Sequence, residues 1–317
     1  MRAFILRLTY FAAPLLIVAC VGDFILSRTL KKSKTISSGE YCTWNDVYEG
    51  KVNSDVVVYG SSRAVVHFDP TIIEDSLHLS CYNLGTDGNN FWLQYFRHGE
   101  FLKHNKKPEA IIFSLDATTL TAKGNIFNST QFLPYMLFDE SIRKYTTSYN
   151  YYSAWDYRVP LVRFFGNERV IMHALKLLFF DQPDSLGRVK GYRGEHLSWN
   201  TDLLEARKMM TSYNVEIDND ALAVFESFLV ECQNLGIRII FVYSPQYIEG
   251  QKFVQNKDQI LDIYRSLSMK YKIPYLDYST DSICYSKTYF YNSSHLNKEG
   301  SKIFSRKLGH DLKHLLN

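Results

Sequence analysis

Hydrophobic residues along this chain fall into short runs that alternate with segments of helical spacing. Five runs are brief and rich in β-branched or aromatic residues, as expected of buried parallel strands: "SDVVVYGSS", "CYNLG", "EAIIFSLD", "IRIIFVYSP" and "IPYLDYS". Between them, apolar residues recur at the three- and four-residue spacing of a helix. Strands that alternate with helices form a parallel sheet covered on both faces. The pattern therefore predicts an α/β fold built on about five parallel strands.

Some of the predicted helices carry recognisable terminal residues. Pro70 suits the first turn of a helix in "DPTIIEDSL". Asn219 or Asp220 is positioned to cap the next long helix, and Gly236 is positioned to end it. The remaining helices are predicted in "NNFWLQYFRHGEFLKH", "NKDQILDIYRSLSMKY" and "NKEGSKIFSRKLGHDLKHLL".

The N-terminus carries one long apolar segment. It runs from Phe4 to Leu26 and is interrupted by Arg7 and Asp23. Its uncharged centre is shorter than the ~20 residues of a transmembrane helix, but the arginine can snorkel and the aspartate can lie near the interface. We therefore predict a membrane anchor over residues 1–30. A cleaved signal peptide is the alternative, and "IVAC" resembles a loose lipoprotein cleavage site.

Charges beside this segment leave its orientation open. Arg2 and Arg7 precede it, and a short tail with two arginines suits a signal-anchor that exports the remainder of the chain. The positive-inside rule alone would instead favour a cytoplasmic body, because more cations lie after the segment: Arg28, Lys31, Lys32 and Lys34.

The rest of the chain divides by composition. Residues 31–52 are polar and of mixed charge, which predicts a stalk. Residues 53–317 contain every predicted strand and form a single predicted domain. The alternation of predicted strands and helices is interrupted between about residues 121 and 200, where aromatic residues are frequent and "RVIMHALKLLFF" predicts a helix. We expect a helical and loop insertion there, after the third strand.

Charge and motif content exclude several functions. A net charge of +3 over 317 residues is too small to indicate a nucleic-acid-binding surface. The five cysteines are scattered without a CxxC pair, which argues against a metal site or a disulfide framework. The chain also lacks a P-loop and a GxGxxG motif. We therefore predict no metal, no cofactor and no nucleic-acid partner, and the oligomeric state stays open.

Three polar segments are placed where a sheet of this kind binds its ligands. Gly60, Ser61, Ser62 and Arg63 form the turn after the first strand, "YNLGTDGNN" follows the second, and His295 precedes the last helix. Each segment alone is commonly a turn, a cap or a solvated histidine. Together they supply a nucleophile, backbone donors and a base at one sheet edge, which is the arrangement that nucleophilic catalysis requires.

These segments resemble the motifs of the SGNH, or GDSL-type, hydrolase superfamily, especially its membrane-anchored bacterial branch. "GSS" matches its Gly-Asp-Ser motif, Asn83 followed five residues later by Gly88 matches the second motif, and "NSSH" matches the final Asp-x-x-His. The resemblance implies a flavodoxin-like three-layer α/β/α sandwich. It also implies that Ser62 is the nucleophile and His295 the general base. The N–H groups of Ser62 and Gly88 would then bind the oxyanion.

The first departure from the family pattern is at the third motif. Where the superfamily has an asparagine that donates to the oxyanion, this chain has Asp116, Thr118 and Thr119. Losing one such donor costs roughly 3 kcal/mol of barrier in proteases. Asn128 or another residue of the insertion is an alternative donor.

The second departure is Asn292, which stands where the final motif has an aspartate. The same change in a serine protease cost roughly 10⁴-fold in rate. Asparagine can accept a hydrogen bond from the imidazole but brings no charge; a backbone carbonyl, Asp277 or Asp281 are alternative orienting groups. Two interpretations remain: a working Ser62–His295 pair with a weakened third member, or an impaired site that only binds.

The resemblance implies an enzyme at the cell membrane, with a single-pass N-terminal anchor and an extracytoplasmic catalytic domain. The expected reaction is hydrolysis or transfer of acyl groups, acetyl above all, on cell-envelope glycans. The alternative is an SGNH-fold protein that binds glycan or assists polysaccharide assembly without catalysis.

Several residues are candidates for contact with such a substrate. Arg63, Asn83 and Asn89 belong to the first two motifs, and His67 follows Arg63 closely. Aromatic residues of the insertion are candidates to stack on sugar rings, although such residues more often form a core: Phe132, Tyr135, Trp155, Tyr157, Tyr192 and Trp199.

Overall fold

The computed structural model describes residues 1–33, 39–125, 127–149, 151–180 and 188–316. The chain separates into two compact units. The first comprises Met1–Asn45 and Asn125–Gly187, and the second comprises Asp46–Gly124 and Arg188–Asn317. The segment that we expected to be an insertion after the third strand is thus shared between the units.

A parallel sheet of five strands forms the centre of the second unit. Its strands are β1 (Val56–Tyr59), β2 (Cys81–Asn83), β3 (Ala110–Leu115), β4 (Arg238–Tyr243) and β5 (Tyr275–Asp277). They lie in the order β2-β1-β3-β4-β5, and each neighbouring pair is parallel. This is the strand order of flavodoxin-like folds. The predicted α/β class with five parallel strands is confirmed.

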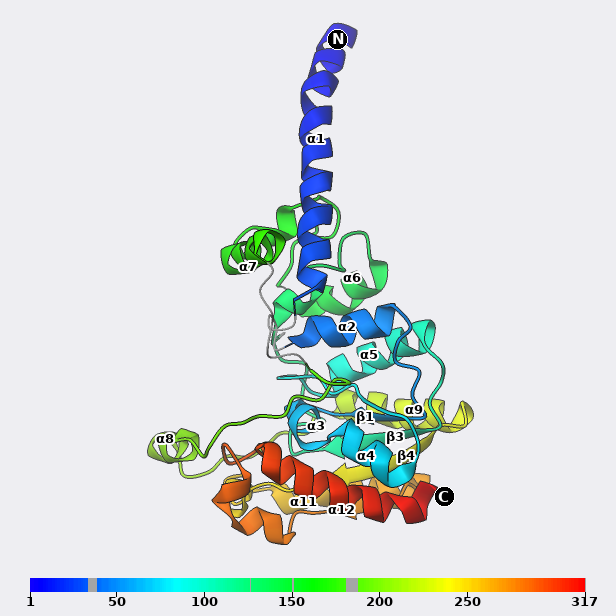
Figure 1. Cartoon of the computed structure of the whole chain (residues 1–317), viewed down its shortest axis with the longest axis vertical. Helices are drawn as coiled ribbons and strands as arrows, with labels where there is room; N and C mark the ends of the chain where they lie inside the picture. The colour runs from blue at the N-terminus through cyan, green and yellow to red at the C-terminus, as the bar shows by residue number, and fades with distance from the viewer. Residues whose placement is uncertain (34–38, 126, 150, 181–187, 317) are drawn as a thin grey trace. The chain divides into compact units, whose positions relative to one another are not determined.

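Alternate residues of each strand are buried in two different cores. In β1, Val57 and Tyr59 face one core, whereas Val56 and Val58 face the other. The first core is closed by α5 (Phe91–His104), α9 (Asn219–Asn234) and α11 (Lys257–Tyr271). The second is closed by α3 (Ser62–His67), α4 (Pro70–Leu77) and α12 (Lys298–Leu316), with the short helix α8 (Asp202–Met209) (Figure 1). The sheet therefore lies between two helical layers.

One helix cap differs from the sequence-based expectation. The N-cap of α9 is Asp218, whose carboxylate accepts a 2.6 Å hydrogen bond from the Ala221 N–H. Our prediction of Asn219 or Asp220 is wrong, because the capping oxygen has to reach an N–H group two or three residues further on. Gly236 ends this helix as predicted, with a φ of +68°.

The first unit contains helix α1 (Arg2–Lys31), α6 (Glu140–Thr146) and α7 (Glu168–Phe179). Length and composition make α1 suitable for crossing a membrane, and a signal sequence has the same character. α7 packs against α1, and Figure 1 shows it beside the C-terminal part of that helix.

The segment that we expected to be a polar stalk contains a helix, α2 (Glu40–Tyr48). Its residues Tyr41, Trp44 and Val47 are buried, and the Trp44 indole donates a 2.9 Å hydrogen bond to the Gln131 side chain. These three residues are spaced as on one helix face, a pattern that the polar residues between them obscure. Residues 34–38 of the same segment lie outside the described residues.

The turn from β1 into α3 depends on Gly60. Its φ is +138°, a conformation that favours glycine. A Cβ atom at this position would lie 2.6 Å from the carbonyl oxygen of Ser114 and 3.0 Å from Cβ of Ala64. The close approach of β3 and α3 therefore leaves no room for a side chain. Ser62 is delivered to the first turn of α3 by this glycine.

Replacing Gly60 by alanine is expected to lower the free energy of unfolding by about 2–4 kcal/mol, because backbone strain and overpacking add. Denaturant unfolding of the full chain in detergent measures the change. Gly99→Ala is the matched control. It lies in α5 with no atom within 4 Å of the added Cβ, so it should be neutral or stabilise by up to about 1 kcal/mol. Equal stabilities for the two variants would contradict the role given to Gly60.

Candidate active site

Ser62 and His295, which are 233 residues apart in sequence, contact each other beyond the carboxyl ends of the strands. The Ser62 hydroxyl oxygen lies 2.8 Å from Nε2 of His295. Both side chains line a pocket of about 200 Å³. Asp116, which follows β3, and Gln246, which follows β4, line the same pocket. The site is thus at the β1–β3 switch point, where sheets of this order bind ligands.

The amide oxygen of Asn292 receives three N–H groups. These are the backbone N–H groups of Ser294 and His295, at 3.0 and 2.9 Å, and Nδ1 of the His295 ring at 3.0 Å. Two backbone donors on one atom identify that atom as the oxygen rather than the nitrogen of the amide. Nδ1 of His295 must therefore carry the proton, which leaves Nε2 free to accept from Ser62.

His67 holds the segment that carries His295. Nε2 of this fully buried residue accepts the Leu296 N–H at 3.0 Å, so Nδ1 carries the proton and donates to the Ser244 hydroxyl at 2.9 Å. Burial lowers the pKa of His67 well below its usual range, and the positive charge of Arg63 adds to that effect. A neutral His67 is required because a protonated Nε2 could not accept. His67 is a positioning residue, and it does not line the pocket.

The environment keeps His295 neutral. Burial, followed by the positive charge of Arg63, lowers the pKa of His295 to about 4, although Asp87 opposes the shift. The Tyr291 ring stacks on the imidazole, with 5.4 Å between centroids and 6° between planes. A neutral imidazole at pH 7 can accept the serine proton. Asn292 adds no charge that would raise this pKa.

Asp116 occupies the place where the family pattern has an asparagine donor. One carboxylate oxygen accepts from the Ser61 hydroxyl at 2.5 Å. The other accepts from the backbone N–H of Thr118 and from the hydroxyls of Thr118 and Thr119, at 2.9–3.3 Å. An ionised carboxylate only accepts hydrogen bonds. Asp116 therefore orders the turn beside Ser62 and cannot donate to an oxyanion.

The two predicted oxyanion donors lie in different surroundings. The N–H of Ser62 opens α3, and the first N–H groups of a helix have no carbonyl of their own helix to bind. Gly88 is exposed in a turn, with a φ of +70°, and is not among the described residues that line the pocket. The structure thus places Ser62 at the pocket but does not bring Gly88 into it.

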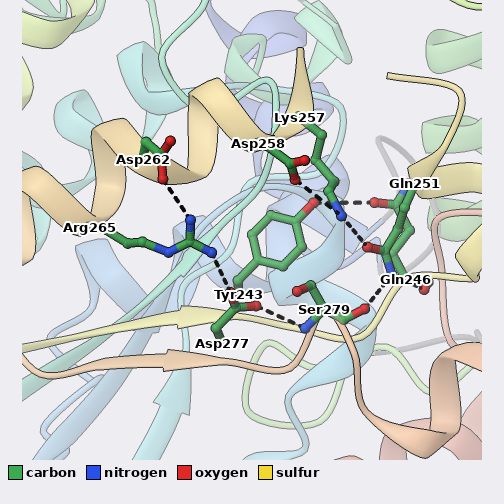
Figure 2. A network of polar contacts seen from close by, with 9 residues as sticks. All are labelled: Tyr243, Gln246, Gln251, Lys257, Asp258, Asp262, Arg265, Asp277 and Ser279. Atoms are coloured by element: carbon green, nitrogen blue, oxygen red, sulfur yellow. Dashed lines mark hydrogen bonds and ion pairs between the residues drawn. The ribbon is translucent and has the colours of Figure 1, made fainter. Parts of the chain in front are cut away.

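Gln246 is a candidate donor that the sequence analysis missed. Its amide nitrogen lies 3.5 Å from the Ser294 hydroxyl, a weak contact that leaves donor capacity toward the pocket. The buried Gln251 fixes its backbone by donating to the Gln246 carbonyl at 2.7 Å and to the Ser279 carbonyl at 2.8 Å. Figure 2 shows this network, in which Lys257 also holds Gln251. The sequence feature that could have indicated this residue is its position within three residues of the end of β4.

The candidate substrate contacts other than His67, which is buried outside the pocket, lie in different surroundings. Arg63 lines the pocket, but its guanidinium donates to the Ser244 carbonyl and lies over the Tyr243 ring. Asn83 is fully buried; its amide donates to the carbonyls of Ala64 and Phe68, which ties β2 to α3. A substrate does not reach such a side chain. Asn89 is half-buried and donates to the Asp87 carbonyl.

The two aspartates considered as alternative orienting groups are engaged elsewhere. Asp277 accepts from the Ser279 N–H and pairs with Arg265, and Asp281 pairs with Lys307. Asn128, the alternative oxyanion donor, belongs to the first unit, and its buried side-chain nitrogen has no hydrogen-bond partner among the described residues. The orienting group of His295 is therefore Asn292 itself.

None of the aromatic residues proposed to stack on sugars is among the described residues that line the pocket. Phe132, Tyr157 and Tyr192 are buried, as expected of core residues. Trp199 packs against Tyr247, with 4.8 Å between ring centroids, and Trp155 is exposed in the first unit. Tyr135 donates to the Asn45 side chain at 2.6 Å. The aromatic residue that lines the pocket is instead Tyr213, which is 41% exposed and was not predicted.

No protein-family model and no curated protein matches the chain. Three solved structures are among those that resemble it. One, from Desulfitobacterium hafniense, is described as a lipolytic protein of the G-D-S-L family; it is 10% identical, covers 80% of this chain and 98% of its own, and has a TM-score of 0.38. An acetyl xylan esterase is 10% identical over 80% and 97% of the chains, with a TM-score of 0.40.

The third is described as an acylhydrolase, from Bacteroides fragilis. It is 12% identical over 87% of this chain and 96% of its own, with a TM-score of 0.38. At these identities and scores the likeness does not bear on chemistry. The geometry of the pocket has to carry any conclusion about function.

The ring of His295 is expected to titrate with a midpoint near pH 4 in the full chain, because burial and Arg63 disfavour its charged form. Asn292→Asp should raise this midpoint, since a carboxylate 3.0 Å from Nδ1 favours the imidazolium. NMR titration of ¹³C-labelled histidine, assigned with His295→Gln, measures both values. A midpoint near 6.5 in the unaltered chain, or no rise in Asn292→Asp, would contradict the proposed environment.

Proposed function

We propose that this chain is a membrane-anchored serine esterase or acyltransferase of the SGNH type, which removes or transfers small acyl groups. The observation that carries the proposal is the 2.8 Å contact between the Ser62 hydroxyl and Nε2 of His295, with Nδ1 of the same ring held by Asn292. A nucleophile, a base and a group that orients the base are the minimum for covalent catalysis. The strand order and the position beyond β1 agree with the family that the motifs resemble.

The reaction proceeds through an acyl-enzyme. Oγ of Ser62 attacks the ester carbonyl carbon while its proton passes to Nε2 of His295. The carbon–oxygen bond to the leaving alcohol then breaks, and the imidazolium returns the proton to that oxygen. Water, activated by the same nitrogen, hydrolyses the acyl-serine; if a second hydroxyl attacks instead, the acyl group is transferred. Asn292 keeps the tautomer that both halves need.

The negative charge that develops on the carbonyl oxygen has two candidate donors. The N–H of Ser62 opens α3, and Gln246 lines the pocket from the segment that follows β4. Asp116 opposes a negative charge nearby, but its oxygens already receive four donors. These donors are expected to stabilise the oxyanion less than a site with an asparagine at the end of β3 would, and the reaction is expected to be slower.

The size and rim of the pocket favour a short acyl group on a sugar. Ligand pockets for drug-sized molecules are about 300–1,000 Å³, whereas this one is about 200 Å³. Ala117 and Val254 supply apolar surface for an acetyl methyl group, and the exposed Tyr213 offers a ring at the rim on which a sugar can stack. Acetylated cell-envelope glycan is therefore the proposed substrate class.

The proposed location rests on α1. Its length and composition suit a single crossing. We propose that it remains attached as an anchor and that the second unit is extracytoplasmic.

A second candidate function is a site that binds glycan without catalysis. Asn292 in place of a carboxylate and Asp116 in place of an oxyanion donor favour it, because each change weakens transition-state stabilisation. The two functions differ in whether Ser62 is reactive.

A fluorophosphonate that labels activated serines is expected to modify the full chain at Ser62. Ser62→Ala should abolish labelling, and His295→Ala should slow it by roughly 10³–10⁴-fold, because the base is lost. Ser266→Ala, an exposed serine on α11, is the control and should label normally. Gel fluorescence and peptide mapping measure the result. A folded protein that resists labelling at pH 7 would support the binding-only function.

Among p-nitrophenyl esters, acetate is expected to be the preferred substrate. Octanoate should give a kcat/KM lower by roughly tenfold or more, since a pocket of about 200 Å³ has no room for the longer chain. Initial rates at matched concentrations provide the measurement, and Ser62→Ala gives the background. A preference for octanoate would contradict the proposed acyl group while leaving the serine mechanism in place.

A further inference from the structure

The first unit exposes an unusual number of large aromatic side chains. Five of them, which we call the aromatic collar, are 63–90% exposed: Phe138, Trp155, Phe165, Phe179 and Phe180. Soluble surfaces rarely expose such apolar groups together. Three come from loops and two from the end of α7, which packs on α1. This surface needs an apolar surrounding.

Helix α1 is free along its first part and packed along its last part. Residues 1–18 are exposed, and contacts with the rest of the unit begin at Ala19 and Gly22. A Cβ atom on Gly22 would lie 3.6 Å from the Leu161 side chain. The free part of the helix spans about 26 Å at 1.5 Å per residue, close to the ~30 Å of a hydrocarbon core. Protein contacts thus begin near the depth at which that core would end.

A buried ion pair fixes this depth. The carboxylate of Asp23 accepts from both terminal nitrogens of Arg163, at 2.6 and 2.7 Å, and from the Leu161 N–H at 2.7 Å. Asp23 and Arg163 are both buried. Sliding α1 further into lipid would separate the pair and leave two charges unsatisfied. The loop that precedes Arg163 is therefore held where the free part of α1 ends.

The collar lies close to this junction. Phe138 shares a cavity with Cys20 and Phe24 of α1. Phe165 lines a second cavity with Leu161, the residue that contacts Gly22. Trp155 begins a turn in which its carbonyl accepts the Val159 N–H at 2.8 Å, and its neighbours Ser153 and Asp156 line the same cavity as Leu161 and Phe165. Phe138, Trp155 and Phe165 thus lie close in the chain or in space to the residues that the ion pair holds, and α7, which ends at Phe179, packs on α1 itself.

We propose that the aromatic collar lies in the interfacial region of the bilayer into which α1 inserts, so that the first unit binds lipid with its loops and α7 as well as with α1. The inference rests on the proposed membrane anchor. Tryptophan is favoured at that level because its ring is apolar while its N–H stays hydrated, and phenylalanine side chains add apolar surface that inserts at the boundary of the acyl chains. Arg158, Arg169 and Lys176 are exposed on the same unit and suit anionic headgroups.

Fluorescence quenching tests the proposal on the full chain. The protein is reconstituted into phosphatidylcholine–phosphatidylglycerol vesicles whose acyl chains carry bromine near the headgroup. We expect these lipids to quench tryptophan emission and Trp155→Phe to remove that quenching. Trp199→Phe is the matched control, because Trp199 is half-buried in the second unit, and should leave the quenching unchanged.

Each failure has a distinct meaning. If the protein stays with the vesicles at alkaline pH but Trp155→Phe leaves quenching unchanged, the aromatic collar does not lie at the interface. The proposed anchoring by α1 is then retained. A Trp155 emission that is blue-shifted but not quenched would mean that a protein surface covers it, and would also overturn the proposal. If the protein is released from the vesicles, the anchor fails and the collar with it. Hydrolysis of p-nitrophenyl acetate, measured in the same preparations, reports separately on Ser62.

Discussion

The hydrogen bond from the Leu296 N–H to His67 is the contact on which the site depends. His67 ends the same short helix that Ser62 begins, and Leu296 directly follows His295. One buried imidazole therefore couples the two segments that must meet. Its other nitrogen donates to Ser244, which follows β4, so the segments after β1 and β4 and the loop before α12 are tied at one point. The Ser62–His295 contact is thereby supported by a second bond one turn further along α3, which restricts their relative movement before any substrate arrives.

The charged groups around Ser62 and His295 differ in position from those of the family pattern. The carboxylate that the family pattern has directly before the serine is absent, since Ser61 stands there. A carboxylate is present instead at the end of β3, as Asp116, and it accepts the Ser61 hydroxyl. On the base side, Asn292 replaces a charge by a neutral oxygen with three donors. The positions of the hydrogen-bonding groups are kept, but no carboxylate beside Nδ1 stabilises a positive charge on His295. Such a site suits an imidazole that stays neutral over a wide pH range, and it stabilises the imidazolium less.

Much of this could be predicted from the sequence, and the remainder could not for identifiable reasons. Strand runs and the order of motifs sufficed for the sheet and for the pairing of Ser62 with His295. Gly88 and Asn83 were assigned to the site from motif spacing alone. Spacing does not determine which way a loop turns, or whether a side-chain amide already donates to backbone carbonyls. Gln246 and His67 had no motif, because their roles arise from residues far away in sequence. Helix α2 was hidden by polar residues between its buried positions, and the Asp23–Arg163 pair joins residues 140 apart.

The sequence separation of Ser62 and His295 has a consequence for biosynthesis. His295, Asn292 and α12 are all translated after residue 291, and the hydroxyls of Ser301 and Ser305 in α12 donate to the His67 carbonyl. A nascent polypeptide therefore contains Ser62 for more than two hundred residues of translation before His295 has been made. Under the proposed mechanism, Ser62 becomes reactive only after His295 and α12 have been translated and α12 has docked.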